Sequence, residues 1–393
     1  MLSFGLVANL APLMTFAATL HEIAADWGLS ASGSGWIGGI YFAGYAVAVP
    51  VLASATDRMD GRRVYVASGL LGAVASFTFA FWAHDFWVAL ILRFLGGISL
   101  AGTHMPGLNL LMDRVEGPQQ GRAAAIYTSI YAGGNAVSFL LAGLIDAAFG
   151  WRATFLAAGI GPLLAICALA LLPSRSPPRS PRSQSPSWRA LVHNRALMAY
   201  VAGFAGNTWE VFAVRVWFVA YLAWVLSLPG NTITLPALGV VSGLASFAGV
   251  PASIAMAEIA TRFGRRLTIV ATCLVSVSTC LALAATTGGS IEIVLPLLVL
   301  VQITSFADVG ALGAGAVSAA DPAQRGTALA IYALAGFATG SLGPIAVGTV
   351  LDLFGGATNA TAWMIGFLTI SVGSAVAACA VWYAPESPKQ YGN

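Results

Sequence analysis

Charged residues are the scarcest class in this sequence. Only 8% of the 393 residues are charged, whereas 58% are hydrophobic and the mean hydropathy is +0.83. Soluble domains contain about 25% charged residues, so this chain has too few of them to cover a hydrated surface. The net charge of +3 is also small and gives no reason to expect a nucleic-acid partner. The natural solvent for such a chain is a lipid bilayer.

Cysteine is scarce as well, and the motifs of enzymes are missing. The four cysteines all lie inside apolar segments, which argues against a zinc site and against a disulfide framework. The sequence has no nucleotide-binding loop, metal-ligand helix or nucleophile motif. We therefore expect neither an enzyme nor an ATP-driven pump, and no cofactor or metal ion. A cleavable signal peptide is not expected either, because no basic segment precedes the apolar stretch from Leu2.

Long apolar segments fill almost the whole chain. A membrane-spanning helix needs about 20 apolar residues, and the sequence predicts twelve such spans. Several exceed that length, which implies that they are tilted or extend beyond the lipid. The predicted spans are 2–20, 35–55, 64–83, 87–112, 123–148, 152–172, 197–226, 233–257, 267–286, 293–318, 327–352 and 361–383.

The basic residues predict the orientation of these spans. Of the 18 Lys and Arg residues, all but three lie in the even-numbered connections and the C-terminal tail. Loops rich in Arg and Lys remain cytoplasmic, so both termini are expected in the cytoplasm of a bacterial cell, with the protein in the inner membrane. The three exceptions are Arg93, Arg152 and Arg215.

A stretch rich in Pro, Ser and Arg separates the first six spans from the last six. Residues 173–196 contain no acidic side chain and cannot bury a core, so they are predicted to form a flexible cytoplasmic linker. Attraction of its arginines to the membrane surface is the alternative interpretation. The predicted domains are residues 1–172 and 197–393, each a six-helix bundle.

The two halves of the chain repeat one another. Gly-Arg-Arg stands at 61–63 and again at 264–266, in equivalent predicted loops. The segment "GRAAAIYTSIYAGG" (121–134) matches "GTALAIYALAGFATG" (326–340), and Asp146 matches Asp352. Three landmarks at nearly one spacing indicate a tandem duplication. The predicted fold is an all-α membrane protein with twelve transmembrane helices in two pseudo-symmetric bundles.

With these features the sequence resembles the major facilitator superfamily. "DRMDGRR" (57–63) resembles that family's motif between spans two and three, and "RFLGG" (93–97) resembles its span-four motif. The proline of the span-five motif found in drug antiporters is missing from "GGNAVS" (133–138), which argues against an antiporter. Within the superfamily the chain looks most like bacterial permeases grouped with cyanate and nitrate carriers.

The resemblance implies a gating role for the loop charges. In the family, such charges hold the two halves together on the cytoplasmic side when the cavity opens outward, and exposed ion pairs are weak enough, at about 1 kcal/mol or less, to break. A pure topology signal is the alternative. The residues that match are Asp57, Arg58, Gly61, Arg62 and Arg63, with Gly264 and Arg265 in the second copy.

Two arginines lie within predicted spans four and seven. Charged residues at membrane depth usually face a bundle interior or an aqueous cavity. Arg93 shares a helix face with Gly97 and His104, which would leave room for an anion, and the alternative is a structural arginine bonded to backbone carbonyls. His104 alone would be a packing histidine. The resemblance implies that Arg93 and Arg215 face one cavity from opposite halves.

Predicted span seven has further polar and aromatic side chains. Glu210 and Arg215 are five residues apart, about 140° around a helix, so each is expected to have its partner elsewhere. Trp217 lies on the same face as Glu210 and is a candidate for binding a substrate. The alternative is that Glu210 and Arg215 join helices together.

Asp308 in predicted span ten is the second candidate carboxyl group. Together with Glu210 it could accept a coupling proton if burial keeps its carboxyl group neutral. A hydrogen bond that packs helices is the equal alternative. On span five, Tyr131 and Asn135 follow a helical spacing and either line a pore or pack against neighbours.

These observations predict a secondary transporter that works by alternating access around a site near the membrane midplane. The expected cargo is a small anion moved with protons, by a permease that is a monomer in the lipid bilayer. Two arginines facing a cavity favour an anion, because a guanidinium group binds carboxylates through two parallel hydrogen bonds. Efflux of drugs or hydrophobic metabolites is the first alternative. A membrane sensor or lipid-moving protein is the second.

Overall fold

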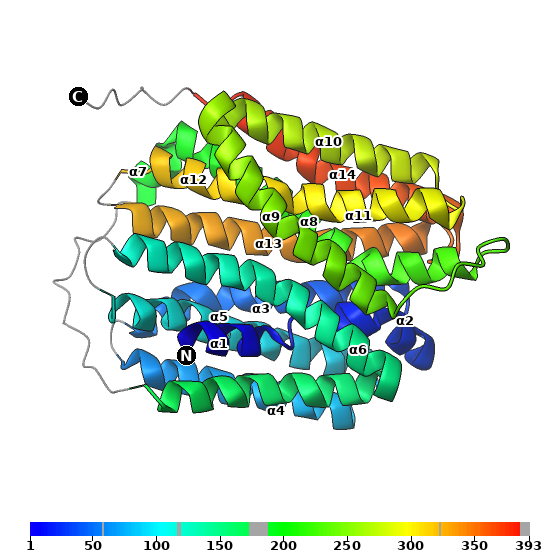
Figure 1. Ribbon diagram of the computed structural model, residues 1–393, viewed down its shortest axis with the longest axis horizontal. Helices are drawn as coiled ribbons and strands as arrows, with labels where there is room; N and C mark the ends of the chain where they lie inside the picture. Colours follow the sequence, from blue (N-terminus) through cyan, green and yellow to red (C-terminus); the bar gives the residue numbers. More distant parts are fainter. Residues whose placement is uncertain (57–58, 116–118, 173–187, 322–323, 386–393) are drawn as a thin grey trace.

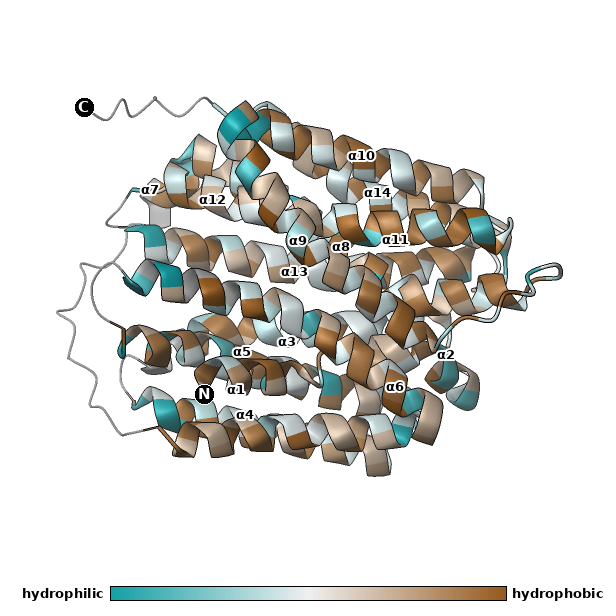
Figure 2. Cartoon of the chain, in the orientation of Figure 1, coloured by the Kyte–Doolittle hydropathy of each residue, from teal (hydrophilic) through white to brown (hydrophobic). Residues whose placement is uncertain are grey.

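A computed structural model describes residues 1–56, 59–115, 119–172, 188–321 and 324–385, and every regular element in these ranges is a helix. Most of the helices run side by side, with the first half of the chain below and the second half above in Figure 1. Polar residues gather at the helix ends and apolar residues along their lengths (Figure 2). This distribution fits helices that cross a bilayer.

The first half of the chain forms six helices in sequence order. The longest contains a break at Gly150, where φ is 77° and ψ is 173°, so it comprises two consecutive spans. Glycine suits this position because residues with a side chain rarely adopt a positive φ. The helices are α1 (Leu2–Leu10), α2 (Thr15–Trp27), α3 (Ala31–Thr56), α4 (Gly61–Trp82), α5 (Phe86–Met112) and α6 (Gln119–Ala170).

The second half repeats this arrangement after a short helix. Its polar interruption lies at Asp308, between two helices that together make one span. The helices are α7 (Trp188–His193), α8 (Arg195–Ser227), α9 (Leu238–Phe263), α10 (Arg265–Ala285), α11 (Ile291–Ala307), α12 (Val309–Ala319), α13 (Arg325–Leu353) and α14 (Ala360–Trp382).

The number of membrane crossings agrees with the sequence prediction. Among the described residues, eleven helical segments are long and apolar enough to span a bilayer, and the one from Ser129 to Ala170 contains the break at Gly150. The chain therefore crosses twelve times in two pseudo-symmetric bundles. Three predicted boundaries were wrong. The first span continues to Trp27 instead of ending near residue 20, and the eighth runs from Leu238 to Phe263 instead of 233–257.

The two halves meet mainly along two pairs of helices, α3 with α13 and α6 with α9, and α2 and α3 also contact α8. Glycines allow the backbones to approach closely at both. A Cβ atom on Gly39 would lie 2.2 Å from the carbonyl oxygen of Ser341, and one on Gly143 would lie 2.5 Å from the amide nitrogen of Val240. Small residues are typical of helix contacts in membranes, where van der Waals packing favours association.

We call the end of the bundle with residues 28–30, 83–85 and 354–359 the far end. It lies on the right in Figure 1, opposite the N-terminus. The connections with most of the arginines lie at the other end, which we call the terminal end. This assignment follows the path of the chain alone and does not assume which end faces the cytoplasm.

Candidate functional site

An aromatic layer lies between the two halves. Phe42 of α3 stacks on Phe212 of α8 with ring centroids 3.7 Å apart and an interplanar angle of 4°. Tyr45, one turn further along α3, lies 4.1 Å from the ring of Phe337 on α13. Rings packed in this way suit a flat aromatic ligand as well as one another. Opposite halves of the chain thus contribute to one cluster of rings.

Arg215 of α8 lies in the same interface. Its side chain is buried, its Nη1 donates a 3.5 Å hydrogen bond to Oδ1 of Asn135 on α6, and its guanidinium group stacks over Phe306 at 5.1 Å. Asn135 donates in turn to the carbonyl oxygen of Tyr131 at 2.7 Å. Within the described chain, no carboxylate forms an ion pair with Arg215. A buried cation with only neutral partners is costly, and an anionic ligand would remove that cost.

His104 joins the cluster from α5. Its Nδ1 forms a 2.9 Å hydrogen bond with the hydroxyl of Tyr45, and its ring stacks on Tyr131 with centroids 4.5 Å apart. Since Tyr131 also begins the chain of contacts that reaches Arg215, the histidine and the arginine lie on either side of one tyrosine and asparagine pair. Four of the predicted substrate residues therefore lie together: His104, Tyr131, Asn135 and Arg215.

Arg93, by contrast, is engaged by the backbone. It donates from Nη1 to Pro12 O at 2.9 Å and from Nη2 to Leu13 O at 3.1 Å, and its guanidinium group stacks over Tyr41 at 4.3 Å. These carbonyl oxygens belong to the break between α1 and α2, where helical hydrogen bonds are lost. The contacts match the structural alternative for this arginine.

The space expected beside Arg93 is filled. A Cβ atom on Gly97 would lie 1.9 Å from the carbonyl oxygen of Tyr41, so this glycine admits the backbone of α3 rather than a ligand. The cavity next to Arg93 has a volume of about 10 Å³, which is barely enough for one water molecule. We therefore leave Arg93 out of the candidate ligand site.

Trp217 lies away from the aromatic layer. Its Nε1 donates to the carbonyl oxygen of Pro344 at 3.0 Å, and its ring meets Trp363 edge-on at 5.8 Å. Tyr221, on the same face of α8, also packs against Trp363. These side chains fill the interior of the second half, so Trp217 is also left out of the ligand site.

Glu210 faces helices of its own half. Oε1 accepts hydrogen bonds from Ser276 at 2.7 Å and from the Cys280 thiol at 3.7 Å, and Oε2 accepts one from Ser374. Ser276 also contacts the hydroxyl of Thr304 at 3.0 Å. The glutamate is fully buried and, like Arg215, has no ion-pair partner among the described residues. Its partners are all hydroxyl or thiol groups.

Asp308 lies one turn beyond Thr304, at the junction of α11 and α12. Its Oδ1 accepts a hydrogen bond from Asn207 at 2.7 Å, and its Oδ2 accepts one from the thiol of Cys273 at 3.3 Å. The side chain is 2% exposed. Two buried carboxyl groups with neutral partners thus lie in the second half, and the Ser276 and Thr304 hydroxyls extend from Glu210 to a residue one helical turn before Asp308.

The charges of the first loop motif are only partly described. Asp57 and Arg58 lie outside the described residues. Gly61 begins α4, whose N-terminus is capped by the carboxylate of Asp60. Arg62 donates to the carbonyl oxygens of Leu169 and Leu172 at the end of α6, in the same half of the chain, and Arg63 is exposed.

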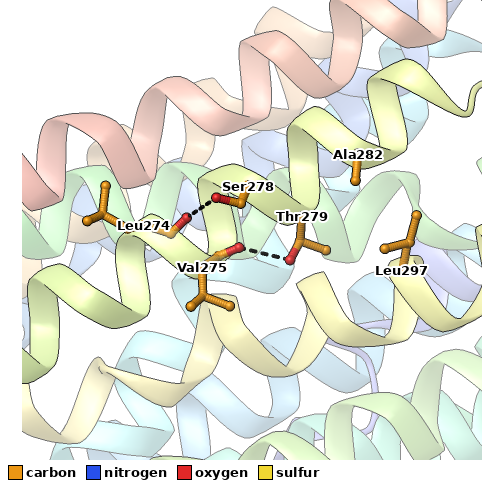
Figure 3. A pocket seen from close by; sticks show the side chains of 6 residues that line it. All are labelled: Leu274, Val275, Ser278, Thr279, Ala282 and Leu297. Atoms are coloured by element: carbon orange, nitrogen blue, oxygen red, sulfur yellow. Dashed lines mark hydrogen bonds between the residues drawn. The ribbon is translucent and has the colours of Figure 1, made fainter.

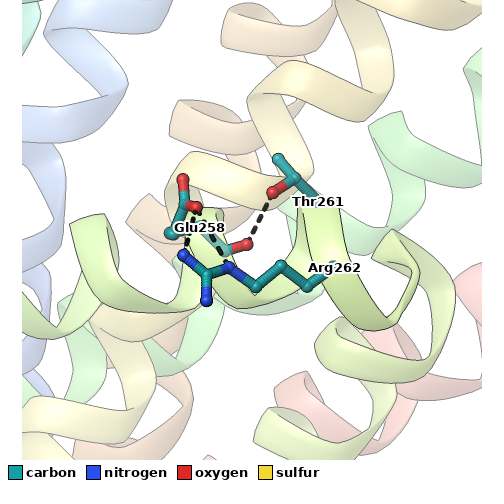
Figure 4. A network of polar contacts seen from close by, with 3 residues as sticks. All are labelled: Glu258, Thr261 and Arg262. Atoms are coloured by element: carbon teal, nitrogen blue, oxygen red, sulfur yellow. Dashed lines mark hydrogen bonds and ion pairs between the residues drawn. The ribbon is translucent and has the colours of Figure 1, made fainter.

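The second copy of the motif lies at the end of α9. Gly264 has a φ of 95°, a conformation that requires glycine, and it separates α9 from α10. Arg265 donates a 2.5 Å hydrogen bond to the hydroxyl of Ser318. Arg262 pairs with Glu258 one turn before it (Figure 4). Both residues of this pair are exposed, so it contributes about 1 kcal/mol or less to stability.

A groove of about 330 Å³ lies on the outer surface of α10, with Leu297 of α11 at its edge (Figure 3). It is lined by Leu274, Val275 and Ala282, together with Ser278 and Thr279. Both hydroxyls donate to carbonyl oxygens of their own helix, so neither has a proton left to donate to a ligand. The groove has the character of a lipid-facing surface.

A family comparison identifies the fold. The sequence profile of the Major Facilitator Superfamily matches residues 2–344. The chain belongs to this superfamily. It is therefore a secondary transporter in a membrane rather than an enzyme, and it binds a small molecule. The resemblance inferred from the loop and span-four motifs is confirmed at the level of the superfamily.

Three curated relatives are transporters. A putative niacin/nicotinamide transporter, NiaP, of Bacillus subtilis is 25% identical over 347 residues, which cover 85% of this chain and 82% of the relative. The niacin transporter NiaP of Acinetobacter baylyi is 26% identical over 152 residues, which make up 34% of the relative. A gentisate transporter of Corynebacterium glutamicum is 27% identical over 167 residues, 37% of its length. The matches to the last two thus span only about a third of those proteins.

Solved structures share the fold at low identity. A bacterial homologue of the human lysosomal transporter Spinster, in an inward-facing and occupied conformation, superposes with a TM-score of 0.79 and 16% identity over 98% of this chain and 95% of the homologue. The nucleoside transporter NupG gives a TM-score of 0.76 and 14% identity, with 97% of each chain covered. The closer likeness to cyanate and nitrate carriers is not tested by these matches and stays a prediction.

The sequence had given little sign of several residues in the site. Tyr45 stands one turn from Tyr41 in the sequence, and the phenylalanines at 42, 212, 306 and 337 are four of twenty in the chain. Of these, only Phe212 supports an aromatic cavity from the sequence, as part of the alternative of hydrophobic efflux. An aromatic residue in an apolar helix can face lipid, the protein core or a cavity, and the residues around it in the sequence are the same in all three cases. Only the packing of helices distant in sequence distinguishes these environments.

Proposed function

We propose that the protein transports a small aromatic carboxylate by alternating access. The observation that supports this most is the position of Arg215, a buried guanidinium group with only neutral partners next to an aromatic layer shared by both halves. The relatives support the same class of cargo, because niacin and gentisate are each a single aromatic ring with a carboxylate group. The name of the Bacillus subtilis relative adds nicotinamide, the neutral amide of the same ring.

Each part of the site has a chemical role in this proposal. Arg215 binds the carboxylate, since a guanidinium group matches its two oxygens. Asn135 holds the guanidinium group in place through its Oδ1. The rings of Tyr45, Tyr131 and Phe337 stack against the aromatic ring of the cargo, in offset or edge-on arrangements.

His104 is proposed to recognise a polar atom on the ring of the cargo. Its Nδ1 is engaged by the hydroxyl of Tyr45, which leaves Nε2 for a ligand. If Nδ1 accepts that hydrogen bond, Nε2 carries the proton and donates to a ring nitrogen such as that of niacin. In the other tautomer Nε2 accepts from a ring hydroxyl such as those of gentisate.

Proton symport is the proposed mode of coupling, with Glu210 and Asp308 as the proton acceptors. Both carboxyl groups are buried, and a lone carboxylate is costly in such a place unless it takes up a proton. The hydroxyls of Ser276 and Thr304 extend from Glu210 to one helical turn before Asp308, and they are the proposed path for a proton between the two groups. Entry of one proton with each carboxylate would make transport electrically neutral.

The remaining parts of the proposal concern topology. The arginine-rich terminal end faces the cytoplasm, with both chain termini inside and the protein a monomer in the bacterial inner membrane. The loop motifs, from Asp57 to Arg63 and at Gly264 and Arg265, hold the halves together at that end when the far end opens. The domains are residues 1–172 and 197–393, joined by 173–196.

Variants of Arg215 test the proposal. In proteoliposomes we expect Arg215→Gln to lower the uptake of nicotinate at least about a hundredfold, because a charged hydrogen bond contributes roughly 1.5–3 kcal/mol and the carboxylate would lose two. Arg215→Lys keeps the charge without the two-pronged geometry and should retain part of the activity. The matched control is Arg152→Gln, since Arg152 is exposed and stacks on Trp151 outside the site.

Either of two results would reject the anion site. Nicotinate uptake by Arg215→Gln at the wild-type rate would show that the guanidinium group does not bind the carboxylate. Uptake of neutral hydrophobic compounds by wild type and variant alike, with no nicotinate uptake, would favour the efflux of hydrophobic metabolites instead.

A further inference from the structure

The two halves are joined at the far end by a helix cap that one half provides to the other. The carboxylate of Asp352, at the end of α13, accepts a 2.9 Å hydrogen bond from the amide of Ala31 on Oδ1 and a 2.8 Å bond from the amide of Ser32 on Oδ2. Both amides belong to the first turn of α3, about 320 residues away along the chain. We call this contact the Asp352 cap.

The cap completes the hydrogen bonding of the α3 N-terminus. The first four amides of a helix lack partners within it. At α3, Ser30 accepts from the next two amides, that of Gly33 on its hydroxyl and that of Ser34 on its carbonyl oxygen. Among the described residues, Asp352 is the partner of the Ala31 and Ser32 amides. A negative charge at this end of a helix also interacts favourably with the helix dipole.

The cap lies at the far end of the α3–α13 crossing, where the backbones of the two halves approach most closely. Beside it, a Cβ atom on Gly348 of α13 would lie 2.3 Å from the carbonyl oxygen of Ala31, so the two backbones touch. One turn into α3, a Cβ atom on Gly35 would lie 2.4 Å from Pro344 O. Opening the far end must separate these surfaces and break both hydrogen bonds of Asp352.

The equivalent crossing has no such cap. Asp146 occupies the corresponding place on α6, but its Oδ1 has no hydrogen-bond partner among the described residues. By analogy with Asp352, Asp146 would cap the N-terminus of α9. That helix begins after Ala237, and no side chain caps it among the described residues. The repeat thus provides the aspartate twice, and only the α3–α13 crossing uses it to join the halves.

We propose that the Asp352 cap sets the equilibrium between the closed and open states of the far end. The proposal rests on alternating access, but it does not depend on the identity of the cargo. Loss of the cap leaves the amide of the buried Ala31 without a partner in the closed state and replaces the exposed bond of Ser32 by water, whereas in the open state both amides are already hydrated. The closed state alone is destabilised, so the population of open molecules rises.

Cysteine labelling can measure this population without any ligand. Val216 of α8 is 2% exposed and contacts Gly38 of α3, within the interface that must separate. We would place Val216→Cys in a variant whose four native cysteines are serine, and follow its reaction with a maleimide in nanodiscs. Both ends of the bundle are accessible in nanodiscs, so the measurement does not depend on orientation.

The expected effect is specific to the cap between the halves. Asp352→Ala should raise the labelling rate about tenfold, and Asp352→Asn less, since its amide retains one acceptor oxygen. The matched control is Asp85→Ala, because Asp85 caps α5 at the same end in the same manner, through the amides of Trp87 and Val88 of its own half. It should label at the wild-type rate.

A second variant separates opening from general instability. Ala31→Pro removes one of the two amides that bond Asp352, while proline suits the first position of a helix. It should therefore speed labelling without lowering the melting temperature. Wild-type labelling in both Asp352→Ala and Ala31→Pro, or an equal increase in Asp85→Ala, would overturn the proposal. Nicotinate binding by Arg215→Gln tests the ligand site alone. The labelling rates test the Asp352 cap whatever the outcome of that experiment.

Discussion

At the scale of single residues, the two buried arginines show how different partners assign different roles. Arg93 donates to two carbonyl oxygens at the break between α1 and α2, whereas Arg215 meets one amide oxygen and the ring of Phe306. Both terminal nitrogens of Arg93 are therefore engaged by the backbone, and Arg215 has a terminal nitrogen left for a ligand. Glu210 is the buried acid of the same helix as Arg215. Its partners are neutral hydroxyl and thiol groups, which donate hydrogen bonds to it but supply no opposite charge.

The carboxyl groups allow a direct test of proton coupling. Glu210→Gln and Asp308→Asn should each abolish accumulation of nicotinate driven by a pH gradient and spare exchange across the membrane, because exchange needs no net proton movement. The measurement compares gradient-driven uptake with counterflow in the same proteoliposomes. Ser278→Ala is the control, since Ser278 bonds only its own helix. Gradient-driven uptake by both acid variants at the wild-type level would exclude these residues as the coupling groups.

Residue spacing predicted part of this site and missed the rest. The angle between Glu210 and Arg215 on a helix indicated different partners, and the two side chains do face opposite ways, toward α10 and α6. The same reasoning could not distinguish Arg93 from Arg215, since the carbonyl oxygens that engage Arg93 lie 80 residues away. A break between helices leaves no charge or motif in the sequence by which to find it.

At the scale of helices, glycine determines how closely the halves approach. Gly39 of α3 lies against the carbonyl oxygen of Ser341, at a distance that admits no side chain. The sequence contains 44 glycines, and their number alone predicts close packing somewhere without telling which helices meet. The crossing of α3 with α13 became visible only from the structure.

Alanine substitutions test this account of the crossing. Gly39→Ala should lower the free energy of unfolding by about 1–3 kcal/mol, the usual effect of overpacking. Gly133→Ala on α6 should leave it unchanged or raise it by about 0.5–1 kcal/mol, because no atom lies within 4 Å of its added methyl group and alanine favours helices. Thermal unfolding in detergent would measure both. Equal melting temperatures for the two variants would contradict the packing.

At the scale of the whole molecule, the twelve crossings and the repeat followed from the sequence, because hydropathy and loop charge are properties of local segments. The shared site did not, since it combines α3, α5 and α6 of one half with α8, α11 and α13 of the other. A site between two halves is what alternating access requires. The central claim is that this site holds an aromatic carboxylate through Arg215.

Calorimetric titration of the purified protein with nicotinate and with nicotinamide tests that claim most directly. The two ligands share a ring and differ in the charge of one substituent. We predict that wild type binds nicotinate at least about tenfold more tightly, as expected for a charged hydrogen bond, and that Arg215→Gln binds the two equally. Equal affinities in wild type, or a preference for nicotinate that survives in Arg215→Gln, would contradict the account.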